Sequence, residues 1–81
     1  MNIQSEISLY PFGVEHLGQP IREFVSALEN EGFEVEMGSM SSRLTGESTA
    51  FFSSLDKVFT HIAEKYPCVL VLKVSNICPV E

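Results

Sequence analysis

Four short segments of the sequence carry the apolar patterns of β-strands, and their order constrains the fold more than any other feature. Residues 2–10 alternate between apolar and polar side chains, as do the shorter segments 33–37 and 42–47. Residues 68–75 instead contain a continuous apolar run, which is typical of a strand covered on both faces. The sequence therefore predicts four strands, the last of which is buried.

Two segments between these strands repeat apolar residues at helical spacing. The first begins at Pro20, which suits the first position of a helix, and Gly32 stands where a left-handed C-terminal cap belongs. The second has Ser48 or Thr49 as its expected N-cap and ends before Pro67, because the residue preceding a proline avoids the helical region. Its apolar positions are Phe51, Phe52, Leu55, Val58, Phe59 and Ile62.

The resulting βαββαβ order predicts an α+β, ferredoxin-like domain that spans residues 1–81. In this fold two helices cover one face of a four-stranded antiparallel sheet. Alternation assigns thirteen side chains to the other face: Gln4, Glu6, Ser8, Tyr10, Glu34, Glu36, Arg43, Thr45, Glu47, Val69, Val71, Lys73 and Ser75. We expect another subunit to cover part of this face, and Arg43 and Lys73 to pair with nearby glutamates.

Charge and cysteine content exclude several classes of function. The net charge is −6 and the five basic residues are scattered, which argues against nucleic acid and anionic membranes as partners. A polar start and the lack of a long apolar run predict a cytoplasmic protein that does not insert into membranes. Cys68 and Cys78 would lie ~30 Å apart on an extended segment, too far for a disulfide. With His16 and His61 they form no metal-ligand spacing, so we expect neither metal nor cofactor.

Three motifs together carry a family resemblance: ISLYP at residues 7–11, SSRLTGE at 41–47 and VSNICP at 74–79. In this order and spacing the chain resembles the thiamine-binding, YkoF-like family of ferredoxin-fold proteins. The resemblance implies a non-catalytic homodimer or homotetramer that binds thiamine or its hydroxymethylpyrimidine moiety in thiamine transport or salvage. It associates the Ser-Asn-x-Cys-Pro ending with pyrimidine or thiamine binding. Arg43 departs from the family, in which other members have a hydrophobic residue.

Asn76 is the first candidate for ligand contact, because a carboxamide both donates to and accepts from the ring nitrogen and amine of an aminopyrimidine. Its alternative role is that of a turn residue before a proline. The hydroxyl of Ser8 and the phenol of Tyr10 are further candidates, although Ser8 can equally bond to a neighbouring strand.

Ser41 and Ser42 stand at the corner that adjoins the ligand in the family, but serine also favours turns. Phe52 offers a ring for stacking or belongs to the core. Cys78 lines the site or is a buried structural thiol.

Two other functions remain open at the level of sequence. One is a ligand-free structural or regulatory oligomer, since a fold does not define a function. The other is an enzyme that uses Cys78 or a histidine, although no catalytic spacing is present and an enzyme is not expected.

Overall fold

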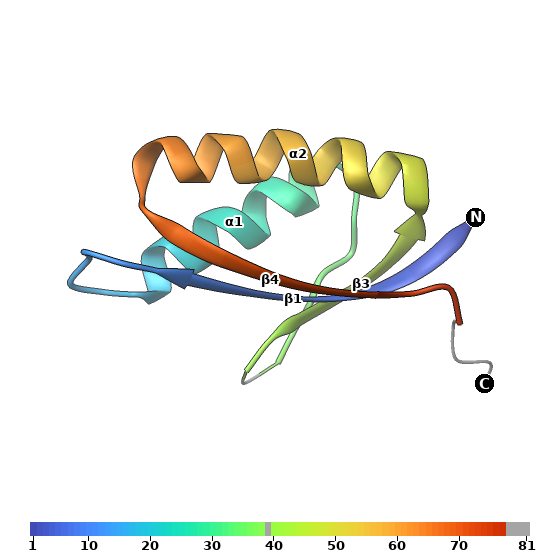
Figure 1. Ribbon diagram of the computed structural model, residues 1–81, viewed down its shortest axis with the longest axis horizontal. Coiled ribbons are helices and arrows are strands. Elements are labelled where there is room, and N and C mark those ends of the chain that lie inside the picture. The colour runs from blue at the N-terminus through green and yellow to red at the C-terminus, as the bar shows by residue number, and fades with distance from the viewer. Residues whose placement is uncertain (39, 78–81) are drawn as a thin grey trace.

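The computed structural model describes residues 1–38 and 40–77, and its elements follow the predicted order. They are β1 (Asn2–Pro11), α1 (Gly18–Asn30), β2 (Glu36–Met37), β3 (Ser42–Glu47), α2 (Ser48–Lys65) and β4 (Cys68–Ser75). The strands form one antiparallel sheet in the order β2-β3-β1-β4, and both helices lie on the same face of it (Figure 1). The predicted ferredoxin-like fold is confirmed.

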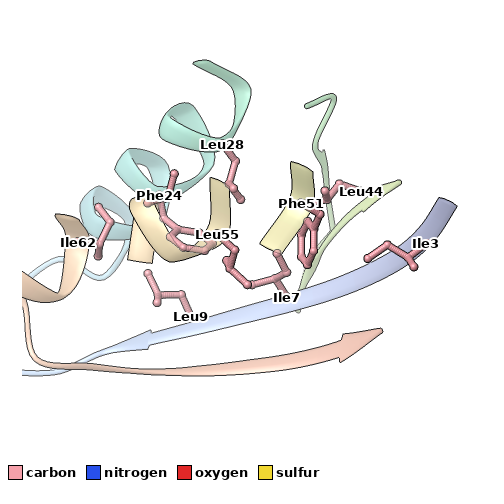
Figure 2. Packing of buried hydrophobic residues seen from close by; sticks show 10 residues of the cluster. Ile3, Ile7, Leu9, Phe24, Leu28, Leu44, Phe51, Leu55 and Ile62 are labelled. Carbon is pink, nitrogen blue, oxygen red and sulfur yellow. The ribbon is translucent and has the colours of Figure 1, made fainter. Parts of the chain in front are cut away.

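The hydrophobic core lies between the helices and β1. Ile3, Ile7 and Leu9 point from β1 toward the helices, where they meet side chains such as Phe24 and Leu55 (Figure 2). Ser5 shares this buried face, and its hydroxyl donates to the carbonyl oxygen of Leu44 at 3.3 Å. The inward-facing side chains of β1, which recur at every second residue, therefore pack against the apolar faces of α1 and α2 in one layer.

Gly32 ends α1 in the way that its position in the sequence predicts. Its φ is +103°, and its N–H donates to the carbonyl of Glu29 at 3.0 Å. The N–H of Phe33 donates to the carbonyl of Leu28 at 3.3 Å, which completes a Schellman motif.

The second strand is shorter than predicted, because only Glu36 and Met37 of segment 33–37 pair with β3. Phe33 is held by the helix-ending turn instead, although Phe33 and Val35 still pack against the core. Alternation with Glu36 would direct Met37 toward the helices, but Met37 is 54% exposed because β2 lies at the edge of the sheet.

Both helix starts differ from the prediction. Helix α1 begins at Gly18, so Pro20 is the third helical residue and not the first. Helix α2 is capped by Glu47, whose extended backbone (φ −76°, ψ 135°) ends β3 and whose carboxylate accepts from the Ala50 N–H at 3.0 Å. Ser48 is already helical. A carboxylate in place of a hydroxyl thus caps the helix.

Within the single chain, only one face of β4 is covered, and the predicted covering of its other face by a subunit stays a prediction. The strand lies at the edge of the sheet, and Leu70 and Leu72 face the helices only partly buried. Val69 and Val71 face the other side and are 48% and 45% exposed. The continuous apolar run therefore leaves a partly uncovered strand.

Candidate ligand-binding site

A groove of about 650 Å³ opens at the end of the molecule where β1 and α2 begin and β4 ends. Figure 1 shows the N-terminus, the start of α2 and the end of β4 close together at this end. The groove is lined by Met1, Ile3, Ser48, Thr49, Phe52, Val74 and Asn76. We call these seven residues the α2 groove. They come from three elements that the fold brings together, and from no continuous motif.

The floor and one wall of the α2 groove are apolar. Ile3 is buried below it, while Phe52 is 47% exposed and turns part of its ring to solvent. The ring of Phe51 packs against that of Phe52 at 70°, with centroids 5.1 Å apart. Phe51 in turn meets Phe33 edge-on, at 6.1 Å and 88°. The exposed ring is therefore braced from the core, and it offers a fixed surface for a flat ligand.

Hydrogen-bonding groups stand at the edges of this apolar floor. Along β4, Val74 pairs with the buried Ser5, so continued alternation directs Asn76 to the same helix-facing side. The next residues form a turn in which the Ile77 N–H donates to the Ser75 hydroxyl at 2.9 Å. The carboxamide of Asn76 and the hydroxyls of Ser48 and Thr49 thus supply both donors and acceptors at the groove.

Glu47 orders the rim of the groove. Its carboxylate accepts from the Ala50 N–H at 3.0 Å and from the Met1 ammonium at 3.2 Å. The backbone N–H of Ala50, followed by the Met1 ammonium, lowers the pKa of this carboxyl below its ordinary value. These two bonds join the first turn of α2 to the start of β1 beside the α2 groove.

The other predicted site residues lie elsewhere. Ser8, Tyr10 and Ser41 are on the face of the sheet opposite the helices, which we call the open face. The Ser8 hydroxyl donates to the Met40 carbonyl at 3.4 Å, and the Ser41 hydroxyl donates to the Glu6 carboxylate at 2.9 Å. Each serine thus has a partner within the chain.

Ser42 and Tyr10 do not line the α2 groove either. Ser42 faces the core and is buried. Tyr10 pairs with Val69 at one end of β4, whereas Asn76 follows the other end, about 20 Å away along the strand. Cys78 lies outside the described residues. Phe52 and Asn76 therefore lie in the same groove, whereas Tyr10 and Ser8 lie on the open face.

Five members of the α2 groove were missed as site residues: Met1, Ile3, Ser48, Thr49 and Val74. In the sequence, Ile3 and Val74 are recognisable only as apolar strand residues. Ser48 and Thr49 are recognisable as residues typical of a helix start, which fits their position but does not indicate a ligand. Only the strand register, which cannot be read from sequence spacing, shows that these residues lie in one groove.

In the part of the chain that the structure describes, no group of three or more histidine, cysteine, aspartate or glutamate side chains could hold a metal ion. Neither helix has the length and apolar character needed to cross a membrane.

The fold and groove define a ferredoxin-like domain with a small-molecule-sized groove on its helix-covered side. The chain belongs to the YKOF-related family, whose model matches residues 2–81. This bears out the family resemblance of the three sequence motifs. No curated protein sequence matches the chain significantly.

Several solved structures share this fold. A Thermotoga maritima protein, assigned provisionally to thiamine biosynthesis or salvage, has a TM-score of 0.85 at 15% identity; the match covers 95% of this chain and 85% of that one. A protein of Methanocaldococcus jannaschii has a TM-score of 0.83 at 16% identity, with 99% and 84% covered. A Streptococcus pneumoniae protein has a TM-score of 0.84 at 12% identity, with 99% and 90% covered. Identities this low establish a shared fold alone.

Proposed function

We propose that the protein binds thiamine or its hydroxymethylpyrimidine moiety in the α2 groove, without catalysing a reaction. The observation that carries this proposal is the meeting of a carboxamide, Asn76, with an exposed and braced aromatic ring, Phe52, in one groove. Membership of the YKOF-related family and the provisional thiamine assignment of the Thermotoga maritima protein support it.

The chemistry of the groove suits a small, flat, polar heterocycle. The Asn76 carboxamide can donate to a pyrimidine ring nitrogen and accept from its exocyclic amine. The hydroxyls of Ser48 and Thr49 can bond to a hydroxymethyl group. Phe52 and Val74 cover the ring and exclude water, which strengthens these hydrogen bonds.

Charge favours the unphosphorylated ligand over its diphosphate. The chain carries a net charge of −6, and Glu47 lies at the rim of the groove. A thiazolium cation is attracted by such a field, whereas a diphosphate is repelled. We therefore expect thiamine and hydroxymethylpyrimidine to bind more tightly than thiamine diphosphate.

The proposed role is ligand handling in thiamine transport or salvage in the cytoplasm. Binding without chemistry requires only groups that hold the ligand, and the carboxamide and hydroxyls of the groove can do so. A reducing compartment would keep the thiol of Cys68 free, as it is in the structure.

Isothermal titration calorimetry with thiamine, hydroxymethylpyrimidine and thiamine diphosphate tests this proposal. We expect Asn76→Ala to weaken binding about tenfold or more, because an unsatisfied polar group costs ~1–3 kcal/mol. Asn30→Ala removes the same carboxamide from the exposed end of α1 and should leave the affinity unchanged. Absence of heat with all three compounds at about 1 mM would refute the proposal.

A ligand-free structural or regulatory oligomer is the second candidate. The exposed Val69 and Val71 on the open face favour it, because such side chains are commonly covered by a partner. An oligomer that binds none of the three compounds would support this candidate over the first.

A further inference from the structure

A second groove, of about 520 Å³, runs between α1 and α2. We call it the inter-helix groove. Ala27 and the buried Ile62 form its apolar part. Its other lining side chains are polar, five from α1 and one from α2: Gln19, Arg22, Glu23, Ser26, Asn30 and His61. The five from α1 recur at intervals of three or four residues, so they share one face of that helix.

Two ion pairs align the helices along this groove. Lys65 pairs with Glu23 at 2.6 Å, and Lys57 pairs with Glu31 at 3.2 Å, so the helices run in opposite directions. The two glutamates are eight residues apart, which corresponds to about 12 Å along α1. His61 lies midway between the two lysines and therefore faces the middle of the groove.

Arg22 is the one basic residue that forms no ion pair with another residue of the described chain. Arg43 pairs with Glu36 and Lys73 pairs with Glu6 at 3.6 Å, which confirms the pairing expected for these two residues. The two lysines of α2 are paired as well. In a chain with eleven acidic and five basic residues, an unpaired guanidinium is an exception.

The acid next to Arg22 in the sequence is occupied by other donors. The Glu23 carboxylate accepts from the Lys65 ammonium at 2.6 Å and from the Tyr66 hydroxyl at 2.7 Å. The Arg22 guanidinium folds back along α1, and its Nη1 lies 2.8 Å from the point where a Cβ atom would stand on Gly18. One end of the inter-helix groove thus carries a positive charge that no carboxylate of the described chain neutralises.

We propose that the inter-helix groove binds a small polar molecule that carries one carboxylate or phosphate group. The guanidinium of Arg22 binds the anionic group, because its planar fork of donors matches the oxygens of either group. The Ser26 hydroxyl, the Asn30 carboxamide and the His61 imidazole donate to or accept from the rest of the molecule. The small side chain of Ala27 leaves the space between the helices that the ligand fills.

The inter-helix groove is separate from the α2 groove, so this proposal does not depend on the proposed function. His61 follows Thr49 by twelve residues, which places the two grooves about 18 Å apart along α2. Their charges also differ, because the α2 groove has Glu47 at its rim and the inter-helix groove has the unpaired Arg22. Either ligand can bind without the other.

Three probes with the same three-carbon body test the proposal: glycerol 3-phosphate, glycerate and glycerol. Each is titrated into ¹⁵N-labelled protein and followed by two-dimensional NMR. We expect at least one of the two anions to cause saturable shifts in the side-chain amide of Asn30 and in the backbone amides of Ser26 and His61. The Kd should be about 1–10 mM, because the net charge of −6 opposes anions. Glycerol, and sodium chloride at the same ionic strength, should not cause these shifts.

Two matched variants test the role of the guanidinium. Arg22→Gln keeps a polar side chain but removes the charge, and it should weaken binding of the anion at least about tenfold. Arg43→Gln removes a guanidinium from the open face and should leave the affinity unchanged, while the spectra show whether each variant is folded. The proposal would be overturned by equal affinities of Arg22→Gln and the wild type, by equal shifts with glycerol, or by no saturable shifts with either anion up to about 20 mM.

Discussion

Gly46 has no side chain at the point where the ring of Phe33 crosses β3. A Cβ atom built there would stand 2.7 Å from Cε1 of Phe33, closer than two carbon atoms can pack. Phe33 contacts Phe51, and Phe51 braces Phe52 at the α2 groove. A missing methyl group in β3 thus sets the position of a ring at the proposed ligand site.

We predict that Gly46→Ala lowers the free energy of unfolding by ~1–3 kcal/mol, the usual cost of overpacking. Urea unfolding followed by circular dichroism measures this change. Thr45→Ala, on the open face of the same strand, is the control and should change stability by less than about 0.5 kcal/mol. A Gly46→Ala variant at least as stable as the wild type would contradict this account, because it would mean that the higher strand propensity of alanine outweighs any conflict with Phe33.

At the scale of elements, Glu23 joins the first turns of α1 to the end of α2. Its carboxylate accepts from the Lys65 ammonium at 2.6 Å and from the Tyr66 hydroxyl at 2.7 Å. These two hydrogen bonds lower the pKa of the Glu23 carboxyl below 4.5, and the bond from Lys65 has the larger effect. The bond to Glu23 is also the main cause that raises the pKa of Lys65 above 10.5 and that of Tyr66 above 10.0.

This network predicts how stability depends on pH. Because the folded pKa of Glu23 is lowered, its contribution is present above pH 4.5 and is lost as the pH falls through the folded pKa. Because the folded pKa values of Tyr66 and Lys65 are raised, their contributions are present below about pH 10 and are lost as the pH rises through them. Glu23→Gln should flatten both limbs of a plot of unfolding free energy against pH. Glu29→Gln, on the exposed side of α1, should flatten neither, and equal behaviour of the two variants would contradict the assignment.

The helices and strands could be predicted wherever burial of one face produces a regular spacing of apolar residues. Strands β3 and β4 have the predicted bounds, and Gly32 ends α1 as its lack of a side chain allows. The predicted bounds are wrong where a local hydrogen bond overrides the spacing of apolar residues. The turn that holds Phe33 shortens β2, and Glu47 caps α2 in place of Ser48 or Thr49. Side-chain and backbone bonds of this kind depend on geometry that a residue pattern does not contain.

At the scale of the whole molecule, the site could be predicted only in part because the sheet separates its candidates by face and by distance. Alternation correctly assigns Ser8 and Tyr10 to the open face, and register sets Asn76 at the far end of β4. The molecule thus has two distinct surfaces, the α2 groove on the helix-covered side and the open face on the other. The proposed ligand belongs to the first.

A titration of ¹⁵N-labelled protein with hydroxymethylpyrimidine, followed by two-dimensional NMR, tests the assignment of the ligand most directly. The account predicts saturable shifts in the side-chain amide of Asn76 and in the backbone amides of Thr49 and Phe52. The backbone amides of Ser8, Tyr10 and Val71 should not move. Shifts confined to these three open-face residues, or no shifts at all up to about 1 mM ligand, would contradict it.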